Sequence, residues 1–294
     1  MNQIQELFSK EPIKIIENMF FFDVEPSTGG SGGDIDENQI DSIVELTEKL
    51  WEAKLDGSYL YQGRGGAISG GWYDSNPLML ADEKAKEIAE SGKAFLEIAC
   101  GEPLGLAPSI LMKNPSANCL LSDASSTIIK ACQKFINKNL KDSNISLAVI
   151  DNRAMPFKDE SFDYVTSFNG INSSSWSGGD SRYLTLKEVY RVLKKGGQLI
   201  TVENEWNDYE KIAEVLKREG IQYGSEQFDR IFNPGEFFRH YFRDGVTMRE
   251  FYESIGFHVD DTDKYTLNRN VKLNFYIKDN IEINIKAQLF VVRK

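Results

Sequence analysis

The chain has 294 residues, of which 41% are apolar and 27% are charged, enough to fill the core of one large domain or two small ones. Its 45 acidic residues outnumber its 34 basic ones, and the formal charge of −11 argues against binding to a nucleic-acid backbone. Two histidines, and three cysteines without a CxxC spacing, exclude a histidine-rich zinc centre, so no metal is expected. Because the sequence shows neither a membrane-spanning apolar run nor a secretory leader, we expect a cytoplasmic protein that contacts no membrane.

Residues 1–91 differ in composition from the rest of the chain. A glycine-rich breaker over 28–34 precedes a segment whose apolar spacing predicts a helix near 37–54. Residues 57–73 combine six glycines with aromatic residues, which suits a lid that closes over a binding site. We expect an N-terminal helical extension with a glycine-aromatic lid. Deleting residues 1–56 should spare the core fold but change turnover of the acceptor. The lid aromatics, which packing explains equally well, are Tyr59, Tyr61, Trp72 and Tyr73.

From about residue 92 short apolar strands alternate with amphipathic helices, which predicts parallel β-α-β units and an α/β fold. Two period-2 runs around 278–280 predict an antiparallel hairpin at one edge of the sheet. We expect one core over 92–294 with an aromatic insertion at about 204–246. Strands are predicted near 94–99, 117–122, 146–150, 162–168, 197–203, 257–261, 271–277 and 281–292. Helices are predicted near 77–91, 104–113, 126–138, 183–193, 207–219 and 247–255.

The stretch from Phe95 to Gly105 is typical of an apolar strand that ends in a glycine turn. Gly101 has no Cβ, so the backbone there can approach a bound group closely, and the following helix offers free N–H groups at its start. Such turns also occur in α/β folds without a ligand. Taken alone, this turn therefore leaves a purely structural interpretation open.

Two carboxylates follow the next two predicted strands. Asp123 lies 22 residues beyond Gly101, where it can either accept both hydrogen bonds of a ribose diol or cap the helix that begins near Ser126. Asp151 can either accept from an adenine amino group or initiate a turn. Because the carboxyl ends of parallel strands line one crevice, the three positions together favour a nucleotide site.

Five segments, in order and correctly spaced, resemble the motifs of class I S-adenosylmethionine-dependent methyltransferases. They are Glu97-Ile-Ala-Cys-Gly101, Asp123-Ala-Ser125, Asp151-Asn-Arg-Ala-Met-Pro-Phe157, Ser161-Phe-Asp-Tyr-Val165 and Leu186-Lys-Glu-Val-Tyr-Arg-Val-Leu-Lys-Lys-Gly-Gly197. The similarity covers about 92–203 and resumes weakly at 247–257. It implies a three-layer Rossmann-like fold whose seven-stranded, mostly parallel sheet has an antiparallel C-terminal strand.

The resemblance implies that the cofactor is S-adenosylmethionine and the product S-adenosylhomocysteine. Glu97 and the turn from Ala99 through Cys100 to Gly101 would face the methionine part of the cofactor. Ala99 and Pro103 stand where the family usually has glycines. The turn is therefore expected to be tighter or shifted.

The other residues that the resemblance assigns to the cofactor follow the second, third and fourth strands. Asp123 would hold the ribose hydroxyls, with Ala124 beside the adenine. Asp151 and the backbone N–H of Asn152 would read the adenine edge. The residues that would lie under the sulfonium are Phe168 and Asn169.

Two segments are candidates for the acceptor pocket, the lid over 57–73 and an aromatic stretch over 223–243 that includes Phe237 and Tyr241. The aromatic stretch can equally be a helix that packs on the sheet. A base is needed only if the acceptor must lose a proton. His240 is the candidate base, and its alternative interpretation is a structural helix histidine.

The leading hypothesis is a methyltransferase whose partner is a small aromatic or apolar acceptor molecule, with oxygen, nitrogen and carbon all open as the acceptor atom. The alternatives are a non-catalytic S-adenosylmethionine-binding protein, a protein or peptide methyltransferase and a nicotinamide-dependent oxidoreductase. The last would need a fuller glycine fingerprint. Residues 167–172 lack the motifs expected of a nucleic-acid methyltransferase. The sequence does not specify an oligomeric state.

Overall fold

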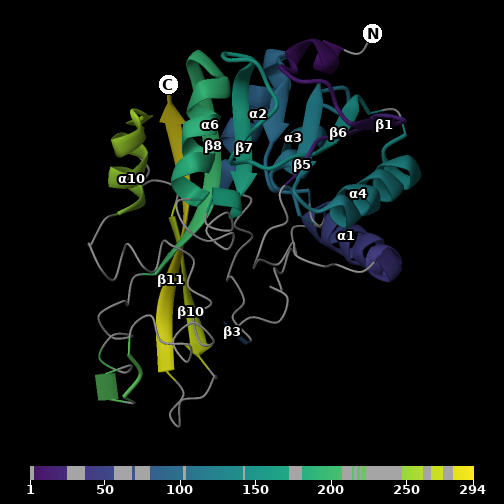
Figure 1. The fold of residues 1–294 in the computed structure, drawn as a ribbon. Helices are drawn as coiled ribbons and strands as arrows, with labels where there is room; N and C mark the ends of the chain where they lie inside the picture. The colour runs from purple at the N-terminus through teal and green to yellow at the C-terminus, as the bar shows by residue number, and fades with distance from the viewer. Residues whose placement is uncertain are drawn as a thin grey trace.

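The computed structural model describes residues 3–24, 37–55, 68–69, 80–101, 104–141, 143–171, 181–206, 214, 217–218, 220–222, 247–260, 266–273 and 281–294. Its helices are η1 (Gln3–Leu7), η2 (Glu37–Gln39), α1 (Ile40–Leu55), α2 (Asp82–Ser91), α3 (Ala107–Leu111), α4 (Ser126–Asn139), α6 (Ser181–Val192) and α10 (Met248–Ile255) (Figure 1). Its strands are β1 (Lys14–Ile16), β2 (Met19–Phe21), β3 (Ile68–Ser69), β4 (Phe95–Glu97), β5 (Cys119–Asp123), β6 (Ile145–Val149), β7 (Phe162–Phe168), β8 (Leu193–Trp206), β9 (His258–Val259), β10 (Thr266–Leu273) and β11 (Ile281–Arg293).

The strands form one sheet in the order β1-β2-β6-β5-β4-β7-β8-β11-β10-β3, and β9 pairs with β11. The neighbours from β2 to β8 pair in parallel, whereas β11 pairs antiparallel with β8, β9 and β10. The predicted α/β fold with an antiparallel C-terminal strand is therefore confirmed. Within the described residues the sheet has eleven strands rather than seven, because β1, β2, β3 and β10 extend the core set.

Alternate residues of the central strands fill two separate cores. Phe95 packs on one face with Ile43 of α1 and Ile128 of α4, whereas Leu96 packs on the other face with Leu186 of α6. This period of two is that of a strand buried on both sides. The result is a sheet between two helical layers, with α1 and α4 on one side and α6 on the other (Figure 1).

Residues 3–24 add an edge to the sheet that the sequence did not predict. Strand β2 pairs in parallel with β6, with Phe20 opposite Ala148. The Phe8 ring stacks on Phe157, with ring centroids 5.4 Å apart, and also contacts Phe20 and Phe22. The division of the chain at residue 91 into an extension and a core stays a prediction. These contacts show that the first part of the chain packs on the core sheet.

The C-terminal strands form the expected antiparallel pair, with Leu273 opposite Ile281. The strand predicted at 271–277 is described at Thr266–Leu273, and it extends with β11 below the helices in Figure 1. Most of the helix predicted at 207–219 lies outside the described residues. Among the helices that the structure describes, none combines the length and the apolar character needed to cross a membrane.

Candidate functional site

The turn after β4 has an unusual backbone. Ala99 and Gly101 both have positive φ, 48° and 55°, a region that strains a residue with a Cβ by about 1–2 kcal/mol. The N–H of Cys100, between them, donates to the carbonyl of Ser122 in β5 at 2.9 Å. The turn thus folds back on the end of the neighbouring strand. Ala99 takes the left-handed conformation, which is the physical reason that the family favours glycine here.

The Asp123 carboxylate lies directly against this turn. Its Oδ2 accepts from the N–H of Gly101 at 3.2 Å, and its Oδ1 accepts from the N–H of Ser125 at 2.9 Å. The N-cap of α4 is Ser125, whose hydroxyl accepts from the N–H of Ile128, so the capping interpretation of Asp123 is wrong. Since a carboxylate oxygen accepts more than one hydrogen bond, both oxygens can also accept from a diol.

Glu97 lies beneath the turn and is fully buried. Its Oε2 accepts from the hydroxyl of Thr166 in β7 at 2.5 Å. A Cβ added at Gly105 would lie 1.9 Å from Glu97 Oε1. The turn therefore closes over this carboxylate because residue 105 has no side chain.

The end of β6 brings Asp151 and Asn152, the two residues expected at the adenine, next to Asp123. The N–H of Ile150 donates to the Asp123 carbonyl at 3.1 Å, and Asp151 follows. The Asp151 carboxylate accepts from the backbone N–H of Arg153 at 2.8 Å and from its guanidinium Nη2 at 2.6 Å. Asn152 Oδ1 is buried and has no hydrogen-bond partner among the described residues. A buried acceptor of this kind is a candidate to receive a hydrogen bond from a ligand.

The end of β7 meets the same turn from the other side. Asn169 has a φ of 55°, and its N–H donates to the carbonyl of Val202 at 2.8 Å. A Cβ on Gly170 would lie 3.0 Å from the Ala99 Cβ. Phe168, immediately before them, is 8% exposed. The β7 end thus packs against the residue that departs from the family pattern.

The ten residues predicted for the cofactor therefore lie at the carboxyl ends of β4, β5, β6 and β7. These four strands are consecutive neighbours in the sheet, in the order β6-β5-β4-β7. These residues differ in solvent exposure, since Glu97 is fully buried whereas Ala124 is exposed. The predicted base and the acceptor and lid residues lie outside the described residues. These are His240, Tyr59, Tyr61, Trp72, Tyr73, Phe237 and Tyr241.

Sequence reasoning missed a second buried carboxylate at this edge. Glu203, near the end of β8, accepts from the hydroxyl of Thr201 at 2.6 Å and from the N–H of Ile171 at 3.2 Å. It therefore holds the segment that follows Asn169. An acidic residue at the end of a predicted buried strand was the available signal. The same signal had identified Asp123.

The cysteine in the turn is not set up as a nucleophile. The pKa of the Cys100 thiol is raised well above its usual value, first by a hydrogen bond with Cys132 and then by burial. Because the thiolate is the reactive form, Cys100 stays a neutral, packed thiol at neutral pH. No group of three metal-binding side chains occurs in the described part of the chain.

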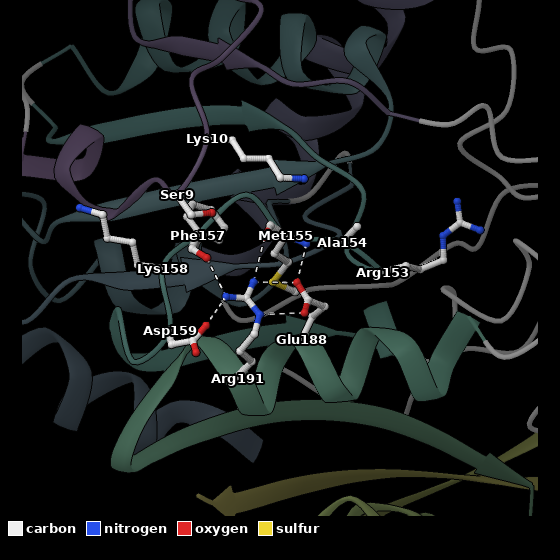
Figure 2. Close-up of a pocket in the computed structure, with 10 residues that line it drawn as sticks. All are labelled: Ser9, Lys10, Arg153, Ala154, Met155, Phe157, Lys158, Asp159, Glu188 and Arg191. Atoms are coloured by element: carbon white, nitrogen blue, oxygen red, sulfur yellow. Dashed lines mark hydrogen bonds and ion pairs between the residues drawn. The ribbon is translucent and has the colours of Figure 1, made fainter.

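A pocket of about 540 Å³, open to solvent, lies beside the segment that follows β6, on the side of α6 (Figure 2). Several of its charged groups pair with one another: Arg191 contacts both Glu188 and Asp159. Neither Gly101 nor Asp123 lines it, so the pocket is distinct from the turn after β4. The lining residues are Ser9, Lys10, Arg153, Ala154, Met155, Phe157, Lys158, Asp159, Glu188 and Arg191.

Comparison with known proteins agrees with this geometry. Residues 96–201 match the methyltransferase domain family. The ubiquinone/menaquinone biosynthesis C-methyltransferase UbiE of Rickettsia bellii is 30% identical over 148 residues, which cover 49% of this chain and 55% of that protein. The demethylmenaquinone methyltransferase of a Geobacillus species is 30% identical over 118 residues, covering 39% and 46%. The chain spans about half the length of the curated relatives it matches.

A solved structure supports the fold. The YcgJ protein of Bacillus subtilis aligns with a TM-score of 0.50 at 15% sequence identity, covering 74% of this chain and 97% of that chain. The matched family covers the strands from β4 into β8, which include the turn that contacts Asp123. Residues 96–201 therefore match a methyltransferase domain, in agreement with the class I S-adenosylmethionine-dependent family that the sequence motifs resemble.

Proposed function

We propose that this protein transfers a methyl group from S-adenosylmethionine to a small, flat, apolar acceptor of the quinone class. The observation that carries the proposal is the contact between the Gly101 N–H and the Asp123 carboxylate. It joins the glycine turn to the acidic end of β5. In Rossmann-like folds a nucleotide binds where these two features meet. The cofactor of this domain class supplies an electrophilic methyl group on a sulfonium.

The described residues suit the adenosyl part of that cofactor. In the proposal, Asp123 accepts from the ribose hydroxyls and the turn around Gly101 passes close to the methionine part. The Asp151 carboxylate already accepts four hydrogen bonds from Arg153. An adenine amino group must therefore displace one of them or donate to Asn152 Oδ1. Asn152 Oδ1 gains from such a bond because a buried, unpaired acceptor costs about 1–3 kcal/mol.

The residues of the chain contribute mainly alignment and exclusion of water. Methyl transfer from a sulfonium is an in-line displacement in which charge disappears, so the acceptor atom must be held within about 3–3.5 Å of the methyl carbon. In the proposal, Phe168 and Asn169 border the reacting centre from the end of β7. Glu97 supports the turn from below through its contact with Thr166.

The acceptor class rests on two supports. Relatives that match this domain are named for methylation in ubiquinone and menaquinone biosynthesis. The segments 57–73 and 223–243 add aromatic side chains that suit a flat apolar molecule. His240 is the proposed base for an acceptor that must lose a proton.

Calorimetry with S-adenosylhomocysteine tests the cofactor site. We expect Asp123→Ala to weaken binding about 10- to 100-fold, because the ribose loses a charged hydrogen-bond acceptor worth about 1.5–3 kcal/mol. Asp41→Ala is the matched control, because that carboxylate is 76% exposed on α1. Equal affinity of the Asp123→Ala variant and the wild type would refute the ribose assignment.

Turnover tests the reaction itself. A demethylated quinol is incubated with the protein and S-adenosylmethionine, and mass spectrometry follows both products. The proposal expects a quinol heavier by one methylene group together with an equal amount of S-adenosylhomocysteine. Tight cofactor binding without any methylated acceptor, across a panel of quinols, would favour a non-catalytic binding protein instead.

A further inference from the structure

Helix α6 contacts residues 155–157, which closely follow the proposed adenine-binding residues Asp151 and Asn152. The contacts come from Glu188 and Arg191, which are three residues apart and lie on one side of the helix (Figure 2). Glu188 Oε2 accepts from the backbone N–H of Met155 at 2.7 Å. Arg191 donates through Nη2 to the Met155 carbonyl at 2.9 Å and through Nη1 to the Phe157 carbonyl at 2.7 Å. Three backbone groups of one segment are thus held by one helix.

The two side chains also hold each other. Arg191 Nε and Nη2 donate to the two oxygens of Glu188 at 2.8 and 2.7 Å, a two-bond pairing that fixes both planes. Arg191 Nη1 adds a contact with Asp159 at 2.8 Å. The pKa of the Arg191 guanidinium is raised, chiefly by its hydrogen bonds with Glu188, so Arg191 stays charged. A lysine lacks the planar guanidinium with its several N–H donors, so at this position it could make only some of these hydrogen bonds.

Met155, which α6 anchors, directly follows the turn that carries Asp151 and Asn152. The N–H of Ala154 donates to the Asp151 carbonyl at 3.0 Å, which closes a turn over 151–154. Met155 comes next, so its anchor on α6 sets how that turn is presented at the sheet edge. Nearby, Asp151 pairs with Arg153 rather than with α6.

We infer that Glu188 and Arg191 are positioning residues for the adenine of the cofactor, acting through the turn that carries Asp151 and Asn152. This inference rests on the proposed function. It predicts that loosening the network lowers adenine recognition, whereas a merely structural pair would affect only the stability of the fold.

The experiment compares two probes by calorimetry: S-adenosylhomocysteine and its analogue with hypoxanthine in place of adenine. The wild type should prefer the adenine compound. In Arg191→Met we expect about tenfold weaker binding of the adenine compound, the loss of about one hydrogen bond, and a smaller preference over the analogue. Arg191→Lys should recover part of the affinity and part of the preference, because it keeps the charge. It also serves as the test variant if Arg191→Met does not fold.

Lys187→Met is the matched control, because it removes a cation from the same helix at an exposed site that packs over Tyr183. A variant that melts earlier but keeps the wild-type affinity and preference would overturn the inference, and so would a wild type that binds both probes equally. If the wild type binds neither probe, the proposed function itself fails. These outcomes separate the two claims.

Discussion

Gly105 lies against the carboxylate of Glu97 in a left-handed conformation, with φ 58°. A Cβ built there falls 1.9 Å from Glu97 Oε1, far inside any normal contact. Glu97 has little room to retreat, since it is fully buried and accepts from Thr166. Both the backbone conformation and the close approach therefore require glycine at this position.

Gly92 provides a matched control for this residue. It also has a positive φ, 67°, but a Cβ there meets nothing within 4 Å. We expect Gly92→Ala to lower the free energy of unfolding by about 1 kcal/mol, the left-handed strain alone. Gly105→Ala should lower it by about 2–5 kcal/mol, because overpacking adds to the same strain. Urea unfolding measures both, and equal losses would show that the Glu97 contact does not matter.

At this scale the sequence located the acidic residues but not their partners. Asp123 could be found because a carboxylate at the end of a predicted strand, 22 residues after a glycine turn, is typical of a site that binds a ribose diol. The contact between Ala99 and Gly170 and the pairing of Asp151 with Arg153 could not be found. Such contacts depend on how separate elements pack, and spacing along the chain does not contain that information.

At the scale of elements, Asp163 at the start of β7 joins three parts of the chain. Its carboxylate pairs with Lys93, before β4, at 2.9 Å and with Lys194 of β8 at 2.7 Å. Burial works against ionisation of Asp163, but hydrogen bonds from Lys194 and Lys93 outweigh it, so its pKa lies below the usual range. A carboxylate whose pKa is lowered by folding stabilises the fold above its unfolded pKa. That stabilisation is lost as the pH falls through the folded pKa.

We therefore expect Asp163→Asn to reduce the free energy of unfolding near pH 7, and we expect the difference from the wild type to shrink toward about pH 3. Urea unfolding at the two pH values checks this prediction. A difference that stays constant, or that grows in acid, would show that the two lysine pairs do not stabilise the fold.

The order of the elements was largely predictable, and the failures have physical reasons. The strands from β4 to β8 were found because short buried runs that alternate with amphipathic helices are typical of an α/β chain. The strands β1 and β2 have three residues each, too few to show a period, and β2 forms because β6 offers an edge. The pairing of β10 with β11 was predicted, but the extent of β10 depends on its partner rather than on its own alternation.

At the scale of the whole molecule, the N-terminal segment also holds residues 156–158, the continuation of the segment that α6 anchors. The N–H of Ser9 donates to the Pro156 carbonyl at 2.9 Å, and the N–H of Lys158 donates to the Leu7 carbonyl at 2.9 Å. The Phe8 ring, between them in sequence, stacks on Phe157. These contacts belong to the second core, so they bear directly on the expectation that residues 1–56 are dispensable for the core fold, which stays a prediction.

Two substitutions in this segment test that expectation without truncating the chain. Phe8 is 8% exposed, and we expect Phe8→Ala to lower the free energy of unfolding by about 3–5 kcal/mol, because it leaves a cavity among Phe20, Phe22 and Phe157. Ile13, 72% exposed just before β1, is the control, and Ile13→Ala should change the same quantity by less than about 0.5 kcal/mol. If Phe8→Ala unfolds at the wild-type urea concentration, the Phe8 contacts do not stabilise the core, and the expectation that residues 1–56 are dispensable for the core fold stands.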